Sequence, residues 1–160
     1  LKADRPGEPP QPVLVLAVGN PSRGDDAIGP TLAARLEAAR LPGVEVISEF
    51  QLQVEHALDL VGRECVIFVD AGAGTPAPYE LRQLSPAAEF LHTSHALSPE
   101  AVLATYQRVR GEAPPESWVL CVRGESFELG ESLSAAASDH LEEAWSALLE
   151  LGRTARRVRD

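Results

Sequence analysis

The chain has 160 residues, 44% of them apolar, which suits one globular domain with its own core. Its net charge is −10, and residues 1–152 are more acidic still, with 10 Lys and Arg against 23 Asp and Glu. So acidic a body disfavours nucleic acid and anionic membranes as partners, and no apolar stretch approaches the ~18 residues of a membrane span.

Both ends of the chain are predicted to lie outside the folded domain. Residues 1–12 hold four Pro and are predicted to form a disordered tail, and residues 153–160 a basic, solvated one. Residues 13–152 then make up a single α/β domain. No signal-peptide pattern is present, and Cys65 and Cys121 lie in apolar runs typical of buried free thiols. These observations favour a cytoplasmic protein.

Strands and helices are predicted to alternate along the chain. Apolar or alternating runs predict strands at 13–18, 44–48, 65–70, 79–84 (an edge strand) and 117–122. Helical spacing of apolar residues predicts helices at 26–40, 54–61, 98–110 and from 134 onward. This order predicts a three-layer α/β/α fold of phosphorylase/hydrolase-like type, with a twisted, mostly parallel five-stranded sheet.

The stretch VGNPSRGDDAIGP, residues 18–30, connects the first strand to the first helix. Its glycine spacing resembles a phosphate-binding P-loop, but Asp25 and Asp26 stand where that loop has Lys and Ser or Thr. Acids at a helix start repel a pyrophosphate, which also argues against a dinucleotide site. We expect Asp25 to cap the helix, which leaves Asp26 free to face a cation.

Two further segments carry polar groups at the same predicted edge of the sheet. Asp70 ends the third strand, and His92 and His95 precede the helix that starts at Ser98. Ligand sites in such folds lie at the carboxyl ends of the strands, so two carboxylates and an imidazole could form a three-ligand site for Ni²⁺, Zn²⁺ or a similar ion. The plainer alternative for Asp70 is an Asx-type turn.

Two other histidines, His56 and His140, lie at helix positions among acidic neighbours. We interpret both as structural residues.

In this order the motifs resemble those of the hydrogenase maturation endopeptidases, which trim the large subunit of nickel–iron hydrogenases. The matching segments are VLAVGNPSRGDDAIGP, VIFVDAGAG, TSHALSPEAVLA and CVRGESFELGESLS. The resemblance spans about residues 13–151. It implies an aspartic-type or metal-dependent endopeptidase that removes the C-terminal extension of a nickel-loaded large-subunit precursor, with nickel in the substrate as the recognition determinant.

The resemblance also implies site residues and partners. Asp26, Asp70 and His95 would bind nickel and act in catalysis, with His95 preferred to His92 because it lies three residues before Ser98. Asn20 and Asp25 would contact the substrate. The precursor would supply the nickel, and the protease is expected to be a monomer.

One segment departs from the family pattern. Many members have an Asp-Gly-Gly-Thr-like loop after the second strand, where this chain reads SEFQLQVE, residues 48–55. This variant resembles the branch that serves soluble, cofactor-linked hydrogenases, and it makes Gln51 and Glu55 candidate substrate contacts.

Two other functions remain open from the sequence. One is a non-catalytic nickel carrier or sensor. The other is a peptidyl-tRNA hydrolase-like esterase, prompted by Gly-Asn-Pro after the opening strand but disfavoured by the acidic body.

Overall fold

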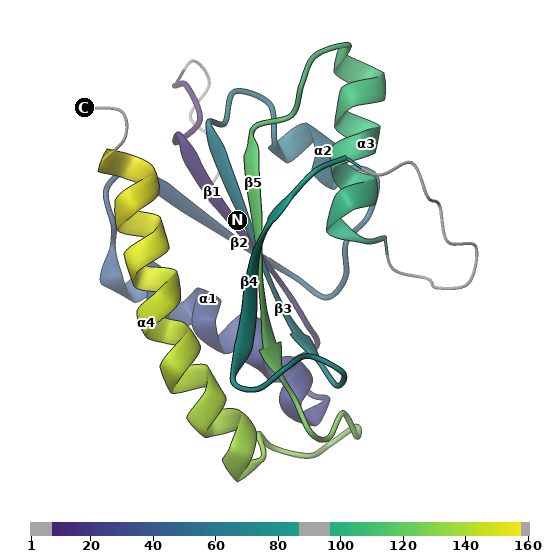
Figure 1. Ribbon diagram of the computed structural model, residues 1–160, viewed down its shortest axis with the longest axis vertical. Coiled ribbons are helices and arrows are strands. Elements are labelled where there is room, and N and C mark those ends of the chain that lie inside the picture. The colour runs from purple at the N-terminus through teal and green to yellow at the C-terminus, as the bar shows by residue number, and fades with distance from the viewer. Residues whose placement is uncertain (1–7, 87–96, 158–160) are drawn as a thin grey trace.

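The computed structural model describes residues 8–86 and 97–157. Strands and helices alternate along most of this length (Figure 1). The strands are β1 (Val13–Val18), β2 (Val44–Glu49), β3 (Cys65–Gly72), β4 (Tyr79–Leu84) and β5 (Glu116–Arg123). The helices are the 3₁₀ helix η1 (Gly24–Ala27), α1 (Ile28–Ala39), α2 (His56–Asp59), α3 (Pro99–Arg110) and α4 (Ala135–Arg157).

The five strands form one sheet in the order β2-β1-β3-β5-β4. All neighbouring pairs are parallel except the pair of β4 with β5, which is antiparallel at the edge. The apolar runs of β1 and β3 are buried on both faces, as expected for central parallel strands. The predicted mostly parallel sheet with an edge strand at 79–84 is confirmed.

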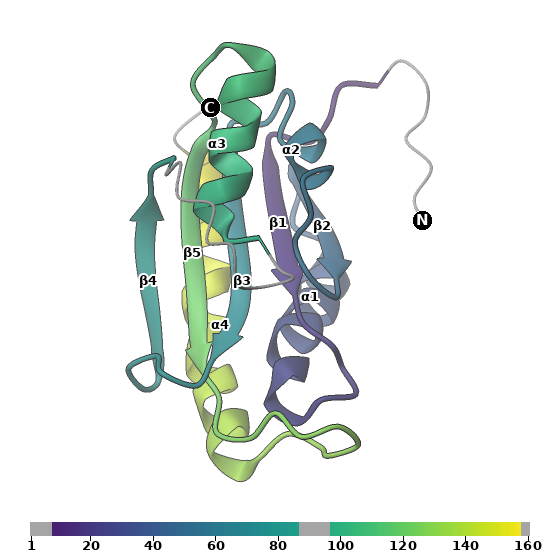
Figure 2. The ribbon, with the colours of Figure 1, turned by 90° about the vertical axis from the view of Figure 1, so that its right-hand side faces the viewer.

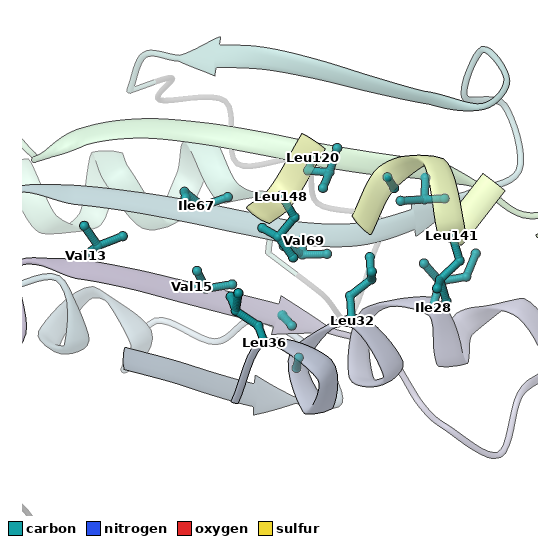
Figure 3. Close-up of a cluster of buried hydrophobic side chains, with 14 of the residues drawn as sticks. Val13, Val15, Ile28, Leu32, Leu36, Ile67, Val69, Leu120, Leu141 and Leu148 are labelled. Carbon is teal, nitrogen blue, oxygen red and sulfur yellow. The ribbon is translucent and has the colours of Figure 1, made fainter. Parts of the chain in front are cut away.

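Helices α1 and α4 cover one face of the sheet (Figures 1 and 2). Figure 3 shows Leu32 and Leu36 of α1 pointing towards the strands, opposite side chains of α4 such as Leu148. Leu32 and Leu148 have no exposed surface. This cluster fixes the start of α1 against the sheet, and the turn before α1 carries the acidic pair.

Helices α2 and α3 cover the other face (Figure 2). Val102, Leu103 and Tyr106 of α3 pack there with Leu14, Leu16 and Phe68 of the strands. The side chain of Ser98 caps α3 by accepting a 3.1 Å hydrogen bond from the Ala101 amide, as the sequence predicts. With a helical layer on each face, the three-layer α/β/α architecture is confirmed.

Several predicted boundaries differ from the structure. The helix expected at 26–40 is a 3₁₀ turn followed by α1, and the helix expected at 54–61 is only the single turn of α2. Helix α4 continues past residue 152 to Arg157, into the stretch expected to be a solvated tail. At the other end, the Pro12 carbonyl accepts hydrogen bonds from the amides of Glu64 and Cys65, so this part of the expected tail is tied to β3.

Over residues 8–86 and 97–157, no helix has the length and apolar character needed to cross a membrane.

Candidate active site

The turn after β1 is a close-packed loop that needs glycine at two positions. Gly19 has φ +153°, and a Cβ there would lie 2.0 Å from the Asp26 carbonyl oxygen. Gly24 has φ +53°, and its Cβ would lie 2.6 Å from the Ser126 carbonyl oxygen. The backbone can therefore fold back on itself only without side chains here. The glycine spacing in the sequence reflects this turn.

Asp26 is partly buried in the 3₁₀ turn, at the carboxyl end of β1. Its Oδ2 accepts a 2.6 Å hydrogen bond from the backbone amide of Asn20. The Asn20 side chain is used within the same turn, where its Oδ1 accepts a 2.9 Å hydrogen bond from the Ser22 amide. Asn20 thus shapes the loop that holds Asp26; its predicted substrate contact remains a prediction.

Asp70 lies in β3, the direct neighbour of β1 in the sheet. Burial raises the pKa of Asp70 to about 6, against a hydrogen bond from the Ala71 amide that lowers it, and the charge of Asp26 raises it further. The two acids, one after β1 and one in β3, are therefore close enough to repel each other. Two of the three residues predicted to form the site are thus carried by the turn after β1 and by the neighbouring strand β3.

The third predicted ligand, His95, and its alternative, His92, lie outside the described residues. Among residues 8–86 and 97–157, no group of three or more His, Cys, Asp or Glu side chains could hold a metal ion. Within that part of the chain, the candidate site is therefore a pair of carboxylates.

Cys121 is beside Asp70, in the position of β5 that pairs with it. Its thiol lies 3.0 Å from the Thr75 hydroxyl and is partly exposed, so the expectation of a buried core thiol was right for Cys65 and wrong for Cys121. Burial and the charge of Asp70 raise the pKa of Cys121 despite the hydrogen bond to Thr75. A thiol kept protonated in this way is a poor nucleophile and a poor metal ligand.

Asp25 takes neither of the two roles expected of it, helix cap and substrate contact. It does not cap the following helix, because neither η1 nor α1 has a side-chain cap hydrogen bond. It also has no exposed surface with which to contact a substrate. Its carboxylate instead accepts hydrogen bonds from the loop between β5 and α4, at Glu125, Ser126 and Ser134.

Those hydrogen bonds set the electrostatics of Asp25. Burial raises its pKa, but the hydrogen bonds from Ser134, Glu125 and Ser126 outweigh burial, so the net pKa lies below the usual value. Asp25 is therefore a stable buried carboxylate. In the sequence, this loop was marked only as part of the family-like segment CVRGESFELGESLS, residues 121–134.

The two candidate substrate contacts after β2 are both exposed. Glu55 borders a hollow between α2 and α3 whose other lining residues are Val54, Ala57, Leu58, Thr105, Tyr106, Val109 and Arg110. Gln51 is not among them. The main chain connects this segment to the acid-bearing turn, because the Gly19 amide donates a 3.0 Å hydrogen bond to the Glu49 carbonyl.

His56 and His140, the two histidines expected to be structural, both contact backbone atoms of the protein. His56 is 8% exposed, and its Nδ1 accepts a 2.8 Å hydrogen bond from the Gln53 amide. His140 places Nδ1 3.1 Å from the Arg123 carbonyl oxygen. Each ring thus bonds to the backbone of the protein.

Neither protein-family models nor curated proteins give a sequence match to this chain. The fold, in contrast, is similar to that of several solved structures. Hydrogenase maturating endopeptidase HybD from E. coli is 27% identical with a TM-score of 0.71, over 89% of this chain and 93% of that one. A solution structure of an endopeptidase from Escherichia coli is also 27% identical, with a TM-score of 0.70 over the same shares of the two chains.

A third similar structure comes from an archaeon. The [NiFe] hydrogenase maturation protease HycI from Thermococcus kodakarensis is 21% identical, with a TM-score of 0.68 over 89% of this chain and 93% of that one. At this identity it supports the fold alone. The E. coli structures are named endopeptidases, and the resemblance drawn from the sequence motifs is confirmed. Structural neighbours over most of this chain are thus hydrogenase maturation endopeptidases, and this similarity indicates an enzyme that hydrolyses peptide bonds.

Proposed function

We propose that this protein removes the C-terminal extension of the nickel-loaded large-subunit precursor of a nickel–iron hydrogenase by hydrolysing one peptide bond. The observation that carries the proposal is the carboxylate pair: Asp26 lies close enough to Asp70 to raise its pKa, at the sheet edge where such folds bind ligands. The similarity to HybD of E. coli, named a hydrogenase maturating endopeptidase, supports the reaction class.

The pair is chemically suited to a divalent cation carried by the precursor. Two carboxylates that repel each other gain from a positive charge between them, and oxygen donors with an imidazole suit ions such as Ni²⁺. We therefore propose Asp26 and Asp70 as two ligands and His95 as the third. Such an ion can polarise the scissile carbonyl and lower the pKa of a water molecule.

Within the proposed reaction the two acids have different tasks. Asp70, with a pKa of about 6 in the metal-free protein, is ionised at neutral pH and so ready to bind the cation, and an oxygen that it leaves uncoordinated can accept a proton from an attacking water. Asp26 is held by the Asn20 amide and faces Asp70 with a negative charge. We propose that the exposed residues Gln51 and Glu55 contact the precursor beside this pair.

We also propose that the enzyme acts in the cytoplasm as a monomer. Its two cysteines are free thiols, which is the usual state in a reducing compartment.

The test is incubation of the purified protein with a large-subunit precursor, with and without nickel, followed by mass spectrometry of the precursor's C-terminus. We expect one cleavage, only in the nickel-loaded precursor. Asp26→Ala, Asp70→Ala and His95→Ala should each abolish it while circular dichroism and melting remain those of a folded protein. Glu37→Ala is the control, because it changes an exposed residue near the C-terminal end of α1, whereas Asp26 precedes the start of that helix; this variant should process the precursor normally.

Normal cleavage by all three site variants would refute the proposal. Stoichiometric nickel binding by calorimetry without cleavage of any precursor would instead indicate a nickel carrier or sensor.

A further inference from the structure

We propose that Asp25 is a positioning residue, whose buried carboxylate clamps the turn that carries Asp26 onto the loop between β5 and α4. The part of this inference that concerns catalysis rests on the proposed function, which gives Asp26 its role in the reaction. The clamp itself stands on contacts within the protein.

The carboxylate of Asp25 is saturated with donors from one distant segment. Its Oδ2 accepts hydrogen bonds from the Glu125 amide at 2.7 Å, the Ser126 amide at 3.0 Å and the Ser134 hydroxyl at 2.8 Å. Its Oδ1 accepts a 2.7 Å hydrogen bond from the Ser134 amide. Because Asp25 has no exposed surface, loss of the carboxylate would leave these donors without a partner in a site closed to water.

Backbone hydrogen bonds join the same two segments. The Asp25 amide donates to the Ser126 carbonyl at 2.8 Å, and the Gly24 amide to the Glu131 carbonyl at 3.1 Å. In the opposite direction, the Gly130 amide donates to the Ser22 carbonyl at 2.7 Å. The turn that carries Asp26 is therefore docked along the β5–α4 loop and not free in solvent.

Ser134 connects the clamp to the long helix α4. Its hydroxyl accepts a 3.1 Å hydrogen bond from the Ala137 amide while donating to Asp25, so one side chain caps α4 and holds the carboxylate. The negative charge of Asp25 at the start of α4 is also favoured by the helix dipole. Since α4 packs on α1 and the sheet, the clamp attaches the turn to the hydrophobic core.

Asp26 follows directly after Asp25 in the same 3₁₀ turn. If the clamp loosens, the turn can shift, and Asp26 shifts with it relative to Asp70. A displacement of about 1 Å in a catalytic group can cost on the order of 100-fold in rate. The Asp26 carboxylate accepts a hydrogen bond from the Asn20 amide, and this bond reports on the position of the carboxylate.

The test uses Asp25→Asn, which keeps the shape but removes the charge and places an amide NH₂ group against backbone donors. With nickel-loaded precursor we expect kcat to fall at least tenfold while KM stays within twofold. Independently of activity, hydrogen exchange of the Asn20 amide, followed by NMR in the protein alone, should become at least tenfold faster.

Ser134→Ala should have the same effects to a smaller extent. Ser134→Thr keeps the hydroxyl, so its kcat and its Asn20 exchange rate should be closer to those of the wild type. Two controls separate positioning from stability. Ser138→Ala changes an exposed residue in the first turns of α4 and should leave both readouts unchanged. Leu148→Ala removes a fully buried side chain of α4, so it should lower the melting temperature but leave kcat and Asn20 exchange unchanged under conditions where it is folded.

The inference would be overturned if folded Asp25→Asn had the kcat and the Asn20 exchange rate of the wild type. It would also be overturned if Leu148→Ala, compared at equal stability, changed kcat and Asn20 exchange as much as Asp25→Asn does. If the wild-type protein processes no precursor, the proposed function fails. The exchange of the Asn20 amide still decides then whether Asp25 holds Asp26 in place.

Discussion

The negative charge of Asp26 raises the pKa of Asp70, although one residue follows β1 and the other belongs to β3. This coupling links the chemistry of the candidate site to the stability of the fold. An acid whose pKa is higher in the folded than in the unfolded chain binds its proton more tightly when folded. At neutral pH, where the proton is absent, the folded state is therefore penalised.

Asp70→Asn should consequently stabilise the metal-free protein at pH 7 while abolishing processing. The pKa of about 6, compared with 3.8 for an ordinary Asp, corresponds to a gain of up to about 3 kcal/mol in the free energy of unfolding. The gain should be complete above pH 6, shrink as pH falls from 6 to 4 and vanish below 4. Urea unfolding with a chelator present measures it. A difference between variant and wild type that does not change with pH would contradict this account.

Asp25→Asn should show the opposite dependence on pH. Hydrogen bonds hold the pKa of Asp25 below its usual value, so its stabilisation is present above about pH 4 and is lost as pH falls through the lowered pKa. We expect a loss of about 2 kcal/mol in the free energy of unfolding at pH 7, since buried donors lose their acceptor. Urea unfolding at pH 7, 5 and 3 should show the two proteins converging at the acid end.

Gly24→Ala should lower stability by about 2 kcal/mol, because Gly24 has φ +53° and its Cβ would meet the Ser126 carbonyl. Gly74→Ala is the matched control: its φ is not in the left-handed region and nothing lies within 4 Å of the added atom. That variant should stay within about 0.5 kcal/mol of wild type. Thermal melts compare the two, and equal melting temperatures would show that the turn can relax around a side chain.

Two valines of α3 offer a test of the core on the face opposite α1 and α4. Val102 has no exposed surface, whereas Val109 is 66% exposed. Val102→Ala should therefore lower the free energy of unfolding by about 2 kcal/mol, and Val109→Ala should change it by less than about 0.5 kcal/mol. Chemical denaturation of both variants is the measurement. A larger loss for Val109 would mean that this surface is covered in solution.

The strands and the mostly parallel character of the sheet could be inferred from the sequence because their signals are local. Runs such as residues 13–18 and 65–69 are apolar throughout, a pattern typical of a strand buried on both faces. The same reasoning predicted that Asp26 and Asp70 lie at one edge of the sheet, and β1 and β3 are indeed parallel neighbours. The length of α4 was underestimated because its last turn is rich in Arg, which resembles a solvated tail.

The role of Asp25 could not be predicted in this way. Its residue type and position fit a helix cap, but its partners Glu125, Ser126 and Ser134 lie about 100 residues further along the chain. Only the folded structure brings that loop to the turn after β1. The local preference of Asp for a helix start lost to four tertiary hydrogen bonds, and periodicity and spacing carry no information about such contacts.

The strand order β2-β1-β3-β5-β4 has a consequence for where a site can arise. From β1 the chain turns outward to β2, whereas from β3 it turns the other way, towards β4 and β5. At the carboxyl ends of β1 and β3 the two connections therefore diverge. In open α/β sheets, ligands bind where the connections diverge in this way. The carboxyl ends of β1 and β3, which carry Asp26 and Asp70, are therefore where the topology favours a site.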